Sequence, residues 1–407
     1  MSNPSDRPLH GVRVIDYSHF LAGPHLSRCL AAMGAEVIKV ERPTAGDAGR
    51  AHGYFKDGQS GYFLQQNMGK LGLCVDMKDP RGRALMMDLV KTADVFVENY
   101  RPGALDRLGL GYDALSKLNP RLIYCSISAY GHTGPDASQP GFGLIAEAKS
   151  GALAMLGEPG HAPPLLRMPV ADMYAGTHGV GAVCAALYGR ERTGRGAHID
   201  LALYDCMISM HDYAVQRFTL SGGVDQPRQT GSHAPDSPIY GIFSASDGAI
   251  AIAAQVDDAW ARLAALIGGP GLAGDARFAT PARRASNYAE ATRLVADWAG
   301  ARTVIECRAA LDAAQVPCAP VQTIAQVLAD PQVRARDMLV EQDHPVLGKV
   351  TLPNLPFRFS SCDTMPSRPA PMLGQHNREI AARLGRQEDE IEQMVKDGVL
   401  YAEQAAG

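Results

Sequence analysis

The sequence predicts an α/β protein whose larger domain is a parallel β-sheet covered by helices. Strand-like and helix-like segments alternate from the amino terminus up to about residue 202. This order is typical of parallel sheets, whose strands are joined by crossover helices. Several strand-like segments are almost continuously apolar, as expected when both faces of a sheet are covered. Beyond them the alternation gives way to short strands and helices, which indicates a second, smaller α+β domain.

The first half of the chain supplies the strands of the predicted sheet. A helix is expected at 24–33, and a second opens at Asp79-Pro80. Asp is a common helix cap, and Pro is favoured at the first helical position. The predicted strands are 12–17, 36–41, 71–76, 94–99, 122–129 and 197–202.

The second half predicts the smaller domain and a return to the first. Gly, Pro and Ser gather at 220–236, which indicates a linker. Strands are then expected at 239–243 and 249–254, helices at 258–267, 288–299 and 304–314, and a last helix at 375–384. The predicted organisation is a large domain that begins at 1–220, a linker and small domain at 221–328, and a return segment at 329–407 that completes the large domain.

Composition excludes several classes of protein. The 407 residues are 46% hydrophobic and 20% charged, with a net charge of -4, as in ordinary globular proteins. Without a basic block, nucleic acid is not an expected partner. No run is long enough to span a membrane and no apolar leader opens the chain, so we expect a cytoplasmic protein. The eight cysteines and twelve histidines form no zinc-binding spacing, and no metal is expected.

Asp172 is the main candidate for chemistry. It stands at the start of a predicted helix rich in Gly and Ala, 170–188. Such a helix makes sense where another backbone packs closely against it. An Asp at the N-cap accepts free N–H groups, and the helix dipole favours its charged form. We therefore expect an anionic carboxylate that attacks an activated carbonyl and forms a mixed anhydride. A purely structural cap is the alternative.

Cations, rather than a glycine-rich loop, indicate an anionic ligand. Arg42, Lys78 and Arg101 each follow a predicted strand, at the end where open α/β sheets bind ligands. Together they could hold phosphate groups, although each alone is more often a solvated surface charge. The first β-α-β unit lacks G-x-G-x-x-G, and the match that begins at Gly141 does not follow a strand. A nicotinamide enzyme is therefore only a remote alternative.

Motifs along almost the whole chain are similar to those of the family III CoA-transferases. They are 11–16 with Ala22-Gly23-Pro24, then 34–43, 98–103, 119–124, Asp172 with its helix, 193–196, 317–321 and 373–376. The resemblance implies a CoA-transferase that moves CoA from an acyl-CoA to a small carboxylic acid without a permanently bound cofactor. It also implies a Rossmann-like large domain made from both chain ends, a small domain, and an interlocked homodimer. In the family, the Asp at the position of Asp172 is the nucleophile.

The resemblance also implies which residues contact CoA or lie beside its thioester. They are His19, Phe20, Leu21, Arg42, Val75, Asp76, Met77, Lys78, Asn99, Tyr100, Arg101, Arg107, Gln139 and Phe142. A structural role for His19 is an equal alternative to a hydrogen bond to an intermediate. Similarly, Arg167 is either the partner of a second substrate carboxylate or an exposed salt-bridge residue.

Two departures from the family pattern narrow the expected reaction. Formyl-CoA transferases have Gln at the position of Leu21, so formate and oxalate are not the expected acids. The α-methylacyl-CoA racemases of the same superfamily pair the Asp with a His in Gly-His-Asp, where this chain has Gly141-Phe142-Gly143. A phenyl ring cannot transfer a proton. We therefore expect transfer, with an acyl-CoA racemase as the alternative.

Overall fold

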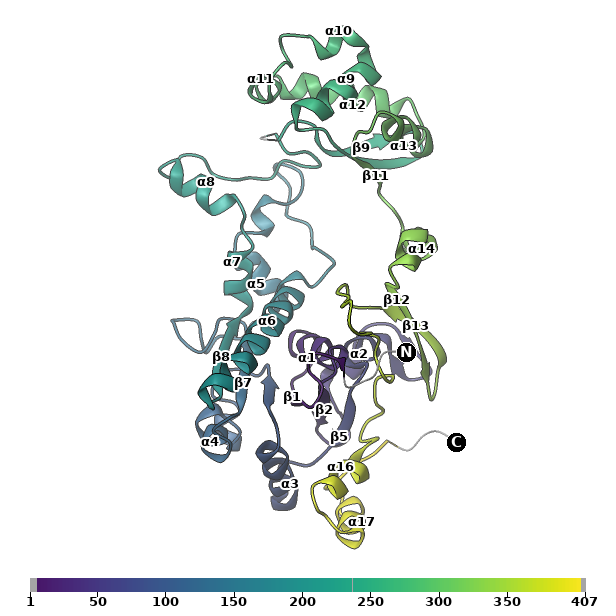
Figure 1. Ribbon diagram of the computed structural model, residues 1–407. Helices are drawn as coiled ribbons and strands as arrows, with labels where there is room; N and C mark the ends of the chain where they lie inside the picture. Colours follow the sequence, from purple (N-terminus) through teal and green to yellow (C-terminus); the bar gives the residue numbers. More distant parts are fainter. Residues whose placement is uncertain (1–5, 236, 404–407) are drawn as a thin grey trace. The chain divides into compact units, whose positions relative to one another are not determined.

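The computed structural model describes residues 6–235 and 237–403, which fold into two compact units (Figure 1). The first unit comprises 6–150, 166–211 and 331–403, and the second comprises 151–165, 212–235 and 237–330. Sequence analysis assigned 151–165 to the large domain. The Gln229 side-chain amide donates hydrogen bonds to the carbonyls of Leu156 (2.7 Å) and His161 (3.1 Å). These bonds join the segment to the second unit.

A six-stranded parallel sheet forms the centre of the first unit. Its spatial order is β5-β2-β1-β6-β7-β8, which is the order of doubly wound nucleotide-binding folds. Ile15 pairs with Ile38 on one side and with Phe96 on the other, and all three are buried. The prediction of a parallel sheet is confirmed. The strands are β1 (Arg13–Tyr17), β2 (Glu36–Glu41), β5 (Leu71–Cys74), β6 (Val95–Glu98), β7 (Ile123–Ser128) and β8 (Ala197–Ala202).

Helices cover the sheet, and they begin where the local sequence favours a start. The Asp79 side chain accepts the Arg81 N–H (2.8 Å) and Pro80 follows it, so α3 begins as predicted. The other elements that precede the return segment in this unit are α1 (Ala22–Ala32), β3 (Phe55–Lys56), β4 (Gln59–Ser60), α2 (Gly61–Asn67), α3 (Pro80–Lys91), α4 (Tyr112–Leu118), α5 (Gly143–Lys149), α6 (Val170–Thr193) and α7 (Leu203–Ser209).

The carboxyl-terminal segment completes the edge of the sheet at β5. His376 Nδ1 accepts the Gly72 N–H (3.0 Å), and Asn377 Oδ1 accepts the Cys74 N–H (2.7 Å). These bonds satisfy donors that an edge strand leaves free, and Figure 1 shows the last helices, in yellow, beside β5. The elements of this segment are α15 (Pro331–Ala335), β12 (Leu339–His344), β13 (Gly348–Pro353), α16 (Asn377–Arg383) and α17 (Glu388–Lys396).

The second unit is a small α+β structure with its own core. Its three-stranded antiparallel sheet has the order β11-β10-β9. Trp260, Val295 and Leu311, from three helices, pack in one buried cluster with Phe243 and Ile250 of the sheet. Its elements are α8 (Ala214–Leu220), β9 (Tyr240–Ala245), β10 (Gly248–Ala253), α9 (Asp257–Gly268), α10 (Pro270–Ala273), α11 (Pro281–Ser286), α12 (Tyr288–Gly300), α13 (Val304–Ala313), β11 (Cys318–Pro320) and α14 (Ile324–Ala329).

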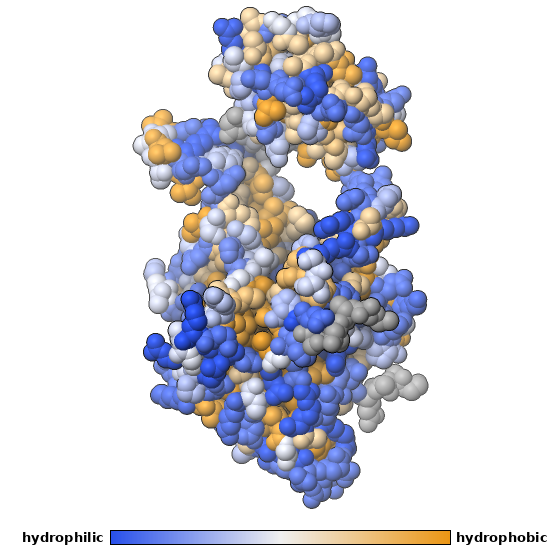
Figure 2. Space-filling view, in the orientation of Figure 1, coloured by the Kyte–Doolittle hydropathy of each residue, from blue (hydrophilic) through white to orange (hydrophobic). Residues whose placement is uncertain are grey.

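The visible surface is mixed in character. In Figure 2 hydrophilic and hydrophobic residues alternate across the face shown, without a continuous apolar band. Within the described residues, no helix has the length and apolar composition needed to cross a membrane.

Candidate active site

The sheet order places a crevice between β1 and β6. The chain leaves β1 toward β2 on one side of the sheet, whereas β6 leads to β7 on the other. Ligands of doubly wound sheets bind outside the carboxyl ends of the strands at such a switch point. A cavity of about 460 Å³ lies there. Its lining comprises His19, Phe20, Ala22, Asn99, Tyr100, Arg101, Ala104, Arg107, Ile127, Ser128, Ala129, Gly141, Phe142, Asp172 and Leu203.

Asn99 holds the loops after β1 and β6 together. Its Oδ1 accepts the His19 N–H (2.8 Å), and its Nδ2 donates to the His19 carbonyl (2.7 Å). The next residue, Phe20, has a φ of 61°, a left-handed conformation that is strained for a bulky side chain. The Phe20 N–H is held by the Asp47 carboxylate (2.9 Å). Two side chains thus fix the loop that lines the cavity.

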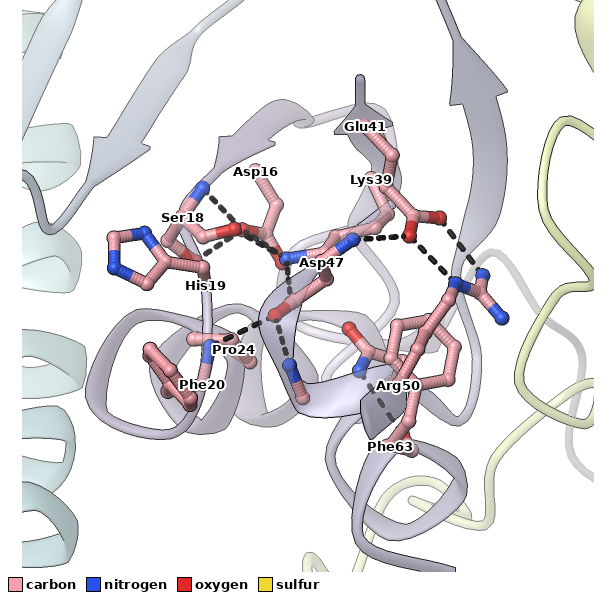
Figure 3. Close-up of polar contacts among 12 residues, drawn as sticks. Asp16, Ser18, His19, Phe20, Pro24, Lys39, Glu41, Asp47, Arg50 and Phe63 are labelled. Atoms are coloured by element: carbon pink, nitrogen blue, oxygen red, sulfur yellow. Dashed lines mark hydrogen bonds and ion pairs between the residues drawn. The ribbon is translucent and has the colours of Figure 1, made fainter. Parts of the chain in front are cut away.

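Buried charged side chains contact this loop (Figure 3): Asp16 and Lys39 form hydrogen bonds with Ser18, and Asp47 forms one with Phe20. The Lys39 ammonium contacts the Asp47 carboxylate (2.7 Å) and donates to the Ser18 carbonyl (2.6 Å). Asp16 accepts from Lys70 (2.8 Å) and from the Ser18 hydroxyl. Burial raises the pKa of Asp16, but Lys39 and Lys70 lower it by more, and the net shift is downward. The two carboxylates and two ammonium groups therefore remain charged and balance one another.

Asp172 lies in the first turn of α6 but is not its cap. The N-cap is Pro169, and no side-chain cap hydrogen bond is present there. The prediction of an N-cap Asp was therefore wrong. Burial first, and the Glu147 carboxylate second, raise the pKa of Asp172 to about 6. At pH 7 roughly ten Asp172 side chains are ionised for each protonated one, so the carboxylate is still mainly anionic.

The small residues of α6 allow close packing against α1, as predicted. A Cβ atom on Gly176 would lie 2.7 Å from the Ala22 carbonyl oxygen. One on Gly179 would lie 2.3 Å from the Leu26 Cδ1 atom. Since α1 follows the β1 loop directly, this packing sets Asp172 beside the cavity. Gly181 has no such neighbour and faces open space.

Gly143 contacts Asp172 from the start of α5. A Cβ atom on Gly143 would lie 2.3 Å from Asp172 Oδ2, so only glycine fits there without a shift of the carboxylate. The adjacent Phe142 is 65% exposed, and its ring meets the Phe20 ring edge to face at 6.1 Å.

Aromatic rings line the cavity on both sides of His19. The His19 ring lies 4.8 Å from Tyr100 and 5.1 Å from Phe20. Burial lowers the pKa of His19 although Asp47 opposes the shift, so the imidazole is neutral at pH 7. Burial, followed by the Asp172 carboxylate, raises the pKa of Tyr62. The Tyr62 phenol therefore keeps its proton near Asp172.

The structure brings together eight of the residues proposed from the sequence. Arg42 is exposed and lines a neighbouring cavity of about 350 Å³ that shares His19, Phe20 and Tyr100. Leu21 is buried, and neither lining includes it. The residues in the main cavity are His19, Phe20, Asn99, Tyr100, Arg101, Arg107, Phe142 and Asp172.

Other proposed residues lie outside both cavities. The segment Val75, Asp76, Met77 and Lys78 follows β5, where the Asp76 N–H donates to the Val399 carbonyl (2.8 Å). Lys78 and Gln139 are exposed. Arg167 is also exposed, with a left-handed φ of 59°. Within the described ranges, no group of three or more His, Cys, Asp or Glu side chains could hold a metal ion.

Sequence reasoning missed Glu147, Asp47, Lys39 and Tyr62. Glu147 acts through Ala171, and Asp47 through Phe20 and Lys39, and these partners are distant in the sequence. The only local signal was a buried-looking Lys in the second strand, since Lys is rarely buried without a partner.

Fold and site together define a doubly wound α/β protein with a ligand crevice at its switch point and a half-buried carboxylate, Asp172, in that crevice. The chain belongs to CoA-transferase family III, whose model matches residues 9–377. It is 34% identical over 398 residues to the mouse succinyl-CoA:glutarate CoA-transferase, which covers 97% of this chain and 91% of the relative. It is 35% identical to the Chloroflexus aurantiacus succinyl-CoA–D-citramalate CoA-transferase, with 95% of this chain and 96% of the relative covered.

A solved structure agrees with the family. The crystal structure of a CAIB/BAIF family protein from Brucella suis matches with a TM-score of 0.83 and 37% identity, covering 93% of this chain and 99% of that one. The protein is therefore an enzyme, a CoA-transferase that acts on acyl-CoA and carboxylic acids.

Proposed function

We propose that Asp172 is the covalent nucleophile of this transferase and that its substrates are dicarboxylic acids. The observation that carries the proposal is the position of Asp172 in the switch-point cavity, with Arg101 and Arg107 in the same lining. The names of the mouse and Chloroflexus relatives support a dicarboxylate on both sides of the exchange. A cationic cavity favours anionic ligands.

The proposed reaction begins with attack of an Asp172 carboxylate oxygen on the thioester carbonyl. The carbon–sulfur bond breaks, CoA leaves as a thiolate, and an acyl-aspartyl anhydride remains. The thiolate then attacks the Asp172 carbonyl carbon, which releases the first acid as a carboxylate and leaves aspartyl-CoA. The acceptor carboxylate repeats both steps in reverse order, takes CoA, and restores the Asp172 carboxylate. No net proton is gained or lost.

The cavity supports this chemistry through its other side chains. We propose that Arg101, Arg107 and Arg42 bind the CoA phosphates, because all three are exposed cations on linked cavities. His19 is neutral and can donate one hydrogen bond to an intermediate.

Transfer is favoured over racemisation. Racemases of this superfamily pair the Asp at the position of Asp172 with the His of a Gly-His-Asp motif, where this chain has Gly141-Phe142-Gly143. Phe142 cannot move a proton, and any side chain on Gly143 would displace the Asp172 carboxylate.

We further propose the interlocked homodimer that the family resemblance implies. The cytoplasmic location stays a prediction.

The experiment is a transfer assay with succinyl-CoA and a set of short mono- and dicarboxylic acids, in which new thioesters are identified by mass. Asp172→Ala should keep its fold and CoA binding but lose transfer by on the order of a thousandfold or more, because the nucleophile is removed. Asp389→Ala, on the exposed face of α17, is the matched control and should be unaffected. Near wild-type transfer by Asp172→Ala would contradict the mechanism, and preference for monocarboxylates would contradict the substrate class.

A further inference from the structure

A buried carboxylate, Glu147, lies close to the half-buried Asp172 and has no part in the proposed reaction. Glu147 is on α5 and is 4% exposed. Its Oε1 accepts the N–H of Ala171, the residue directly before Asp172 (3.2 Å). Gly143, which contacts the Asp172 carboxylate, is one turn earlier on the same face of α5. The face of α5 that carries the Glu147 carboxylate therefore lies against Asp172.

This charge is not neutralised locally. In the part of the chain that the structure describes, no Lys, Arg or His forms an ion pair with Glu147, and the Ala171 N–H is the donor to its carboxylate. A carboxylate buried with one neutral donor is costly. Ala171 needs only a neutral acceptor at this point, which an amide would supply at lower cost. The negative charge therefore needs a reason other than the start of α6.

The reason can be found in the change of charge on Asp172 during the reaction. Two nearby carboxylates repel each other. When Asp172 is acylated, or linked to CoA, it becomes neutral and the repulsion disappears. A negative charge on Glu147 would thus destabilise the free Asp172 carboxylate relative to each covalent form. The same charge makes the Asp172 oxygen more basic, and a more basic oxygen is a better nucleophile.

We propose that Glu147 is a positioning residue for Asp172: its Oε1 fixes the first turn of α6 through Ala171, and its charge drives the Asp172 carboxylate toward its acyl and CoA-linked forms. This inference rests on the proposed function of Asp172. The pKa of Asp172, raised to about 6 by burial and then by Glu147, agrees with it.

Other ionisable groups around Asp172 do not supply the same effect. His25 of α1 is neutral, because burial lowers its pKa to about 4, and Tyr62 of α2 keeps its proton. Arg101 and Arg107 of the cavity lining carry the opposite charge to Glu147. Other ionisable side chains on α6, on the helices that contact it, or in the cavity loops include His25 and Arg28 (α1), Lys149 (α5), Tyr174 and His178 (α6), Tyr204 and Asp205 (α7), and His19, Tyr100, Arg101 and Arg107 of the cavity loops.

The test compares Glu147→Gln, which keeps the acceptor for Ala171 but loses the charge, with Glu147→Asp, which keeps the charge. Glu392→Gln, on the exposed face of α17, removes a remote charge and serves as the control. The rate of Asp172 modification by succinyl-CoA is measured from about pH 5 to about pH 8 by hydroxylamine trapping and peptide mass. Steady-state kinetics with succinyl-CoA give kcat and KM separately.

For the wild type we expect the rate of Asp172 modification to rise with pH, with the midpoint of the rise near pH 6. We call this rise the limb of the pH–rate profile. In Glu147→Gln the limb should move down by roughly half a unit to one unit, and the plateau above it should fall about threefold or more. The loss should appear in kcat with KM unchanged, since Glu147 does not line the cavity. Glu147→Asp should keep the wild-type limb, and Glu392→Gln should behave as wild type.

Other results would show whether the inference about Glu147 fails alone or whether the proposed function of Asp172 fails with it. A wild-type limb and plateau in Glu147→Gln would overturn the inference while the proposed function stands. A lower plateau without a shift of the limb would show that Glu147 only holds α6, and would also overturn it. If Glu147→Gln does not fold, a folded Glu147→Asp with a displaced limb would contradict the role of the charge. If Asp172 of the wild type is never modified, the proposed function itself fails.

Discussion

At the scale of single residues, Arg42 carries an exposed charge at the carboxyl end of β2. Arg50, close to it in the sequence, is paired with Glu41 (2.7 Å). Arg42 has no such carboxylate among the described residues, and it lines a cavity that shares His19, Phe20 and Tyr100 with the cavity of Asp172. An unpaired Arg at this place fits a phosphate of CoA.

Arg42→Ala should therefore weaken CoA binding by about 1–3 kcal/mol, because charge-assisted hydrogen bonds are among the stronger polar contacts. Isothermal titration with CoA measures the change. Lys117→Ala, which removes an exposed cation on α4 that lines neither cavity, is the control. Equal CoA affinity in Arg42→Ala and the wild type would exclude Arg42 from the phosphate site.

The sequence was sufficient to predict Asp172 as the central residue of the site, but not the buried carboxylates Glu147 and Asp47 that support the site. Asp172 was identified from its place at the start of a helix, although Pro169 is the actual cap and burial raises the pKa that a cap would lower. Glu147 and Asp47 could not be found, because their roles depend on Ala171 and Phe20, which no local pattern connects to them. Contacts between buried charges that are far apart in the sequence depend on the complete fold, so a local sequence pattern does not predict them.

At the scale of elements, the strands were predictable because their apolar runs end at turn residues. The predicted strand 36–41 coincides with β2, and 197–202 coincides with β8. The ends of α1 were harder to predict. Every residue of α1 is buried, its polar residues His25, Ser27 and Arg28 included, and the helix starts two residues before the predicted position.

The segment 151–165 shows that the prediction of helices and strands does not reveal which unit a loop belongs to. It contains no long helix or strand, so the sequence gives no sign of which unit it joins. Hydrogen bonds from Gln229 and Gly231 decide this in the structure. By contrast, the return of the chain's end to the first unit was expected, and His376 and Asn377 bind the edge of β5 there.

At the scale of the whole molecule, the interlocked homodimer is a proposal with a distinctive consequence. Linked subunits cannot separate unless one chain partly unfolds, so dilution alone should not produce monomers. Light scattering during size exclusion, over a wide range of dilution, should give twice the mass of one chain throughout. A folded monomer at low concentration would exclude the interlocked arrangement.

The central claim is that Asp172 is covalently modified during turnover, and trapping with hydroxylamine tests it most directly. Anhydrides and thioesters react with hydroxylamine, whereas free carboxylates do not. After incubation with succinyl-CoA, peptide mass should show a hydroxamate at Asp172 alone, and none when succinyl-CoA is omitted or Asp172→Ala is used. A hydroxamate on another carboxylate, or transfer of CoA with Asp172 unmodified, would show that Asp172 is not the nucleophile.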